Sequence, residues 1–169
     1  MAEPPEEPRS FLPILVRDVA LIIACVGAWQ SELRDVAAGV DVPLARSLLA
    51  GGLTVVVGFF AHEYGHLLGA LASGARVHAQ APWSPLLFHF DVARSTRRQF
   101  LAMSYGGYAA SAVSATVIAL TVPWDRLSGW TALGLMGVGL FVTAVLEIPT
   151  HVRVLRGGPL PTGAAYVSE

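Results

Sequence analysis

Apolar residues along the chain are gathered into four long stretches that short polar segments separate. The stretches cover residues 11–29, 48–72, 100–122 and 130–148. Each approaches the ~20 apolar residues that a helix needs to cross a bilayer. The pattern predicts an all-α membrane protein, built as a bundle of about four transmembrane helices. Because proline cannot continue a helix without losing a backbone hydrogen bond, Pro123 and Pro149 predict where the last two helices end.

The segments outside these stretches are too polar to cross a membrane. Residues 1–10 are acidic and proline-rich, so we expect a disordered N-terminal tail. The connection at residues 73–99 alternates in part between apolar and polar positions, which predicts a small β-like loop at about residues 75–92, at the membrane surface. Residues 159–169 are expected to form a C-terminal tail. A single transmembrane domain at residues 11–158 remains.

The composition agrees with lipid as the main solvent of this domain. Hydrophobic residues make up 54% of the chain and charged residues 14%, whereas about 25% of the residues of a soluble protein are charged. The formal net charge of −1 gives no sign of nucleic-acid binding. Arg17 and Asp18 are charged residues within the first stretch, where they can neutralise each other, or Arg17 can reach the lipid headgroups.

The arginines indicate how the domain is oriented. With four crossings, seven arginines lie on the side that holds both termini: Arg9, Arg76, Arg94, Arg97, Arg98, Arg153 and Arg156. Three lie on the other side: Arg34, Arg46 and Arg126. Because arginine and lysine concentrate in cytoplasmic loops, we expect an integral protein of a bacterial plasma membrane with both termini in the cytoplasm.

A polar motif, His62-Glu63-Tyr64-Gly65-His66, interrupts the second apolar stretch. Two histidines four residues apart lie on the same face of a helix, where both can bind one metal ion. Such side chains are costly inside a bilayer unless they are paired or bound, and they usually serve a function there. The sequence therefore predicts a zinc site on His62 and His66, with Glu63 as the base that activates zinc-bound water.

A catalytic zinc site needs a third protein ligand and a fourth position that is open to water. Glu147 is the strongest candidate, because it is the acid of the fourth stretch and is expected at the depth of the motif. His151 is the alternative third ligand. Asp91 and His89 are further candidates if the β-like loop folds back over the site, and His78 is expected to lie on the surface.

The segment at residues 60–77 resembles the first core segment of the site-2 protease family of intramembrane zinc metalloproteases. In that family H-E-x-G-H lies on a membrane helix, and small residues and a short β-rich loop follow it. The resemblance covers roughly residues 48–158. It implies a metalloprotease-like domain in which His62 and His66 bind zinc and Glu63 is the catalytic base.

The chain also departs from the pattern of that family. Residues 97–111 resemble its next core helix, but Gly106-Gly107 stands where the family has Gly-Pro, and Ser111 or Ala110 stands where it has asparagine. Family members continue with an Asp-Gly pair whose aspartate is the third zinc ligand. Arg156 occupies the place of that aspartate here, so either Glu147 or His151 replaces it or the metal site is incomplete.

These observations lead to an expected function with open alternatives. We expect a membrane-embedded zinc metallopeptidase that hydrolyses a peptide bond in or near a transmembrane segment of a protein or peptide substrate. The β-like loop at residues 75–92 could pair with an extended substrate strand. A catalytically inactive site-2-protease-like scaffold or complex subunit is the main alternative, and a metal-dependent enzyme that modifies a lipid or small molecule is a third.

Overall fold

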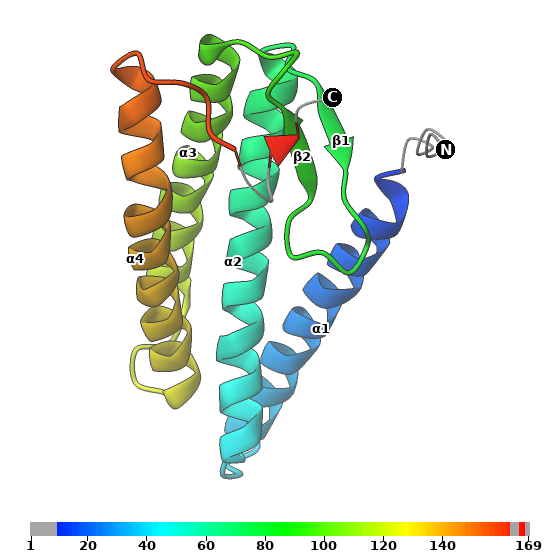
Figure 1. Cartoon of the computed structure of the whole chain (residues 1–169). Coiled ribbons are helices and arrows are strands. Elements are labelled where there is room, and N and C mark those ends of the chain that lie inside the picture. The colour runs from blue at the N-terminus through cyan, green and yellow to red at the C-terminus, as the bar shows by residue number, and fades with distance from the viewer. Residues whose placement is uncertain (1–9, 163–165, 168–169) are drawn as a thin grey trace.

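Four helices make up most of the protein (Figure 1). The structure is a computed structural model that describes residues 10–162 and 166–167, so the predicted tail at residues 1–10 lies outside the described residues except for Ser10. Within that part the helices are α1 (Leu12–Ala37), α2 (Leu44–Ala72), α3 (Arg97–Thr121) and α4 (Leu127–Leu155). Three of them, α1, α2 and α4, are long and apolar enough to cross a membrane.

The predicted four-helix bundle is therefore confirmed as an arrangement of helices, whereas only three of them qualify as membrane spans by composition. Helix α3 has 25 residues, which is long enough, but its serines, threonines and glycines and the Arg97-Arg98 pair make it less apolar than the others. Large apolar side chains are exposed along the outer faces of the bundle. Such extensive apolar surface is typical of a protein whose surroundings are lipid.

The predicted end of the fourth helix at Pro149 is wrong, because α4 continues through this residue to Leu155. Proline removes one backbone hydrogen bond from a helix. Helices at membrane depth tolerate this loss where neighbouring groups or local adjustment satisfy the freed carbonyl. Pro123, by contrast, lies in the connection between α3 and α4, as predicted.

Helices α2 and α3 approach each other closely through small residues. A β-carbon built on Gly65 would lie 2.5 Å from both the side chain of Ala110 and the carbonyl oxygen of Gly106. A β-carbon on Gly69 would overlap the backbone of α3 at Ala102. Small residues of this kind let helix backbones meet in membranes, and here they bring the motif of α2 against α3.

The predicted β-like loop forms a hairpin, and a third strand joins it. Strand β1 (Val77–Ala79) pairs antiparallel with β2 (Phe88–Asp91), with Val77 opposite Phe90. Strand β3 (Tyr166–Val167) pairs in parallel with the other edge of β2. The segment predicted as a C-terminal tail thus contributes to the sheet, and the folded unit extends beyond residue 158.

The sheet lies beside the half of α2 that carries the motif (Figure 1). Phe88 and Phe90 of β2 belong to one buried apolar cluster with Leu67 of α2 and Phe100 of α3. The hairpin is also tied to α1, because the Arg17 guanidinium donates hydrogen bonds of 2.7 Å to the carbonyl groups of Pro82 and Ser84. The loop therefore folds back along the helices as far as the motif.

Of the two alternatives for Arg17 in the first stretch, the structure shows the ion pair with Asp18. A nitrogen of Arg17 lies 2.7 Å from the Asp18 carboxylate, which is almost fully buried. The hydroxyl of Tyr64 also donates to Asp18 at 2.9 Å. Because Tyr64 belongs to the motif, this contact fixes α1 against the motif-bearing turn of α2.

Candidate metal centre

Three side chains of the types that ligate metals converge between two helices. His62 and His66 come from α2 and Glu147 comes from α4. The Nε2 atoms of the two histidines are 3.0 Å apart. Glu147 directs one carboxylate oxygen to His62 Nε2 at 3.1 Å and the other to His66 Nε2 at 3.3 Å.

These separations suit the coordination shell of a zinc ion. Zinc binds imidazole nitrogen and carboxylate oxygen at about 2.0–2.1 Å, so two ligand atoms in a tetrahedral shell stand about 3.3 Å apart. The distances among His62, His66 and Glu147 are within a few tenths of an ångström of this value. Two histidines and a glutamate are also a donor set of catalytic zinc sites, where a fourth position stays open.

The second nitrogen of each imidazole is hydrogen-bonded to α3. His66 Nδ1 lies 3.0 Å from the carbonyl oxygen of Met103. A carbonyl can only accept, so Nδ1 carries the proton and a neutral His66 presents the lone pair of Nε2 to the cluster. His62 Nδ1 lies 2.7 Å from Ser111 Oγ. Partners of this kind hold metal-binding histidines in one orientation.

The ring of His66 also depends on a glycine of α3. A β-carbon built on Gly107 would overlap the imidazole of His66. Glycine at this position leaves the space that the ring occupies, so the ring lies flat against the backbone of α3. In the sequence, Gly106-Gly107 belongs to a stretch rich in small residues, which predicts close helix packing, and departs from a family pattern. The contact of Gly107 with His66 could not be predicted, because it joins two helices.

Glu63 lies beside the cluster and is not one of its three converging groups. Its side chain is buried, and its carboxylate accepts a hydrogen bond of 3.3 Å from the backbone N–H of Leu87 in the hairpin. The same carboxylate lines a cavity together with His66 and Glu147. Glu63 is thus held at the wall of the same cavity as two of the three converging side chains.

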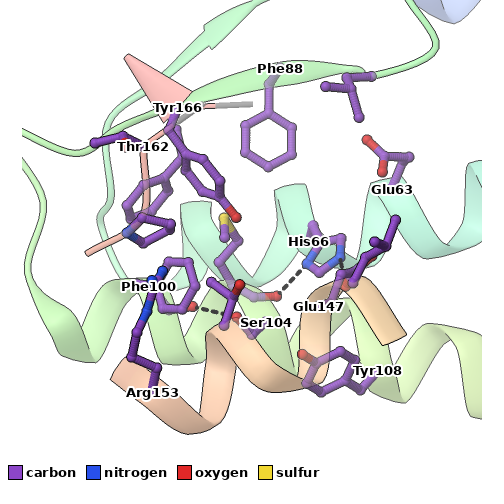
Figure 2. Close-up of a pocket in the computed structure, with 16 residues that line it drawn as sticks. Glu63, His66, Phe88, Phe100, Ser104, Tyr108, Glu147, Arg153, Thr162 and Tyr166 are labelled. Atoms are coloured by element: carbon purple, nitrogen blue, oxygen red, sulfur yellow. Dashed lines mark hydrogen bonds and ion pairs between the residues drawn. The ribbon is translucent and has the colours of Figure 1, made fainter. Parts of the chain in front are cut away.

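This cavity of about 280 Å³ extends from the cluster along α3 and α4 and beneath the sheet (Figure 2). Its walls are mainly apolar and aromatic, with Phe88, Phe100 and Met103 among them. Arg153 adds a positive charge away from the cluster. An apolar cavity with a few convergent polar groups is the usual form of a small binding site.

Strand β3 closes one side of the cavity. Figure 2 shows the ring of Tyr166 directed into the cavity, and this ring packs against Phe100 at 6.2 Å between centroids. Burial, with the nearby negative charges of Glu147 and Glu63, raises the pKa of Tyr166 to about 12. The hydroxyl therefore stays protonated at physiological pH, and no sequence pattern had indicated this residue.

The other predicted candidates lie away from the cluster. The ring of His151 packs edge-on against Tyr105 and Tyr108, with ring centroids 4.8 and 5.4 Å away, so it is not the third group beside His62 and His66. Asp91 is buried at the end of β2, where it accepts a hydrogen bond from the backbone of Arg94. His78 and His89 face each other in the hairpin register and do not reach the cluster.

Comparison of the chain with protein-family models, with curated proteins and with solved structures finds no match. Its function is therefore inferred from the residues of the site. Ser111 and Arg156, two of the positions that depart from the site-2 protease pattern, have clear places in the structure. Ser111 contacts His62. Arg156 is the C-cap residue of α4, whereas Glu147, which approaches the histidines, lies more than two turns earlier in the same helix.

Proposed function

We propose that this chain is a membrane-embedded zinc metallopeptidase that hydrolyses a peptide bond in or next to a transmembrane segment of a protein substrate. The observation that carries the proposal is the convergence of His62, His66 and Glu147, with Glu63 on the same cavity wall. A cluster of this kind between apolar helices at membrane depth is costly unless a cation or a proton links its members. Its donor set and spacing favour zinc.

Zinc bound there would supply a Lewis acid, which polarises a substrate carbonyl and makes a water molecule more acidic. The protein supplies the remaining functions. The Glu63 carboxylate can hold the proton that the attacking water loses and pass it to the nitrogen of the departing amine. Met103 and Ser111 orient the histidines, and the apolar walls of the cavity limit the access of other water molecules.

The substrate must reach the cluster as an extended segment, because a helix hides its amide groups. Addition of a strand to a sheet edge is a general means of holding a peptide extended. Strand β2, whose residues Phe88 and Phe90 line the cavity, pairs with β1 on one edge and β3 on the other. A substrate strand that adds to β2 beside the cavity would therefore take the place of β3.

Peptidase activity can be tested in cells whichever membrane protein is the substrate. Cells that lack the protein are supplied with the wild type or with Glu63→Gln, and new N-termini in the membrane proteome are identified by mass spectrometry. We expect N-termini within or next to transmembrane segments in the wild-type cells, and their loss with Glu63→Gln. The variant should retain zinc, since Glu63 is not part of the converging cluster. A His151→Ala variant serves as the active control.

Two outcomes would contradict peptidase activity. Identical sets of N-termini with wild type and Glu63→Gln, in a protein that holds zinc, would favour the non-catalytic scaffold or complex subunit. A change in lipid composition in place of new N-termini would favour the lipid-modifying alternative.

We propose that both termini are cytoplasmic, because seven arginines lie on the side of the termini and three on the other. This orientation places the cluster nearer the cytoplasmic surface.

A further inference from the structure

Two adjoining cavities, one apolar and one with charged groups in a largely apolar wall, lie toward the other end of the bundle from His62, His66 and Glu147. The apolar one is a groove of about 560 Å³ between α1, α2 and α3. Cys25 and Trp29 of α1, Val57 of α2 and Ile118 of α3 line it. From Leu33 to Cys25 the groove follows α1 for about 12 Å at 1.5 Å per residue. Its lining is mainly apolar, as a hydrocarbon chain requires.

Arg126 joins this groove to a second hollow of about 530 Å³ at the ends of the helices. Glu32, Asp41 and Ser47 line the hollow together with Arg126. Glu32 is almost completely buried and its Oε1 accepts a hydrogen bond from Ser128. Among the described residues, neither Glu32 Oε2 nor Arg126 Nη1 has a hydrogen-bond partner, although both atoms are buried.

The hollow lies at the depth where lipid headgroups are expected. It is built from the end of α1, the start of α2 and the start of α4. Trp124 and Trp130 flank Arg126 in sequence, are more than half exposed and pack edge-on at 5.7 Å between centroids. Exposed tryptophans are typical of the membrane–water interface, so the apolar groove leads from this interface toward the membrane centre.

We propose that the groove and the hollow together bind one phospholipid whose headgroup carries a primary ammonium group, as in phosphatidylethanolamine. One acyl chain occupies the groove, the phosphate pairs with Arg126, and the ammonium group donates hydrogen bonds to Glu32 and Asp41. The guanidinium group of arginine binds phosphate through charge-assisted hydrogen bonds. This site is independent of the proposed peptidase activity.

The pairing of opposite charges selects this headgroup over the other common ones. A phosphatidylglycerol headgroup offers a phosphate to Arg126 but brings no positive charge to Glu32 and Asp41. A phosphatidylcholine headgroup carries the positive charge but has no N–H to donate. A charged hydrogen bond contributes about 1.5–3 kcal/mol, so loss of this bond weakens binding roughly tenfold or more.

Native mass spectrometry of the purified full chain, with the three lipids bearing identical acyl chains, tests the proposal. We expect one lipid per chain and an affinity for phosphatidylethanolamine about ten times that for phosphatidylcholine or phosphatidylglycerol. Glu32→Gln should abolish this preference while it keeps the acceptor for Ser128. Should that variant fold poorly, Asp41→Asn at an exposed position should reduce the preference in the same direction.

Arg126→Gln should weaken the binding of all three lipids about tenfold, because each carries the phosphate. Arg34→Gln is the matched control, since Arg34 is exposed near the same end of α1 and does not line the hollow. Equal affinity for the three lipids, or equal effects of the Arg126 and Arg34 variants, would overturn the proposal. A complex of two chains that excludes lipid would assign the groove to a second copy and would overturn it as well.

Discussion

Each imidazole of the candidate metal centre is held through both of its ring nitrogens. Its Nε2 atom faces the cluster, and its Nδ1 atom is hydrogen-bonded to α3. His66 donates to the Met103 carbonyl, and His62 bonds to Ser111. A free histidine has several rotamers and two tautomers, so these contacts select the state in which both Nε2 atoms face Glu147. The residues of α3 therefore orient the two histidines toward Glu147, as a metal ion at this position would require.

Ser111→Ala is expected to weaken zinc binding by roughly 10–100-fold, the usual effect of removing a hydrogen-bond partner of a metal-binding histidine. Competition with a chelator of known affinity measures this change. Ser104→Ala is the control, because the Ser104 hydroxyl bonds within its own helix to the Phe100 carbonyl and does not contact a histidine. Equal zinc affinity in the two variants would show that Ser111 does not orient His62.

Gly107→Ala should also impair the centre, because its methyl group would overlap the ring of His66. We expect a loss of zinc content with little loss of helix content, since alanine favours the helix more than glycine does. Metal analysis together with circular dichroism checks both. Unchanged zinc content would mean that the ring can move aside without leaving the cluster.

Among the individual residues, the roles proposed for His62, Glu63 and His66 could be predicted from the sequence, because their fixed spacing on one helix determines their relative positions. Glu147 required one more step, the expected membrane depth of an acid on another helix. Ser111 stood at a family position without a role, and Tyr166 was not found. Their roles depend on contacts between elements, which no periodicity along one element encodes.

Among the elements, α2 and α3 pack against each other most extensively. This packing positions His62 and His66, since both histidines are hydrogen-bonded to α3. Gly69→Ala is expected to destabilise the protein by about 1–3 kcal/mol, the usual cost of overpacking, because its methyl group meets the backbone of α3. Unfolding in detergent micelles measures the effect.

Gly52→Ala is the matched control on the same helix, since the space beside Gly52 is open. It should be neutral or stabilise the protein by up to about 1 kcal/mol through the helix preference of alanine. If the Gly69 and Gly52 variants unfolded alike, close packing of α2 on α3 would not hold the site together.

Removal of strand β3 also has a clear expected result. A chain that ends at Gly158 lacks the cavity wall formed by Pro161, Thr162 and Tyr166, and it frees one edge of β2. We expect several-fold more of the membrane-proximal cleavage described above, and Tyr166→Ala should show part of the gain. A fall in cleavage would instead make β3 part of the substrate-binding surface.

The elements themselves could be predicted from the sequence to different degrees. Four helices and the hairpin follow from apolar stretches and from alternation. The continuation of α4 through Pro149 could not be predicted, because the rule that proline ends a helix holds best in water. A strand of two residues such as β3 has no pattern of its own and exists only through its pairing with β2.

For the whole molecule, the decisive question is whether α3 crosses the membrane despite its lower hydropathy. The start of α1 and the end of α4 lie at the same end of the bundle (Figure 1), as four crossings require. In a Cys25→Ala background, which removes the single cysteine, impermeant maleimide applied to intact cells should label Val40→Cys. It should not label Ser10→Cys or Arg156→Cys. Labelling of only one of the two terminal positions would mean an odd number of crossings.

The measurement that tests the account most directly is the zinc content of the purified full chain and two variants, determined by elemental mass spectrometry after expression with sufficient zinc. A site built by His62, His66 and Glu147 predicts about one zinc per chain in the wild type. We expect the Glu147→Ala variant to lose nearly all of its zinc. The His151→Ala variant should keep its zinc, because His151 packs against Tyr105 and Tyr108 and not against the cluster. A wild type without zinc, or zinc that persists in Glu147→Ala and is lost in His151→Ala, would contradict it.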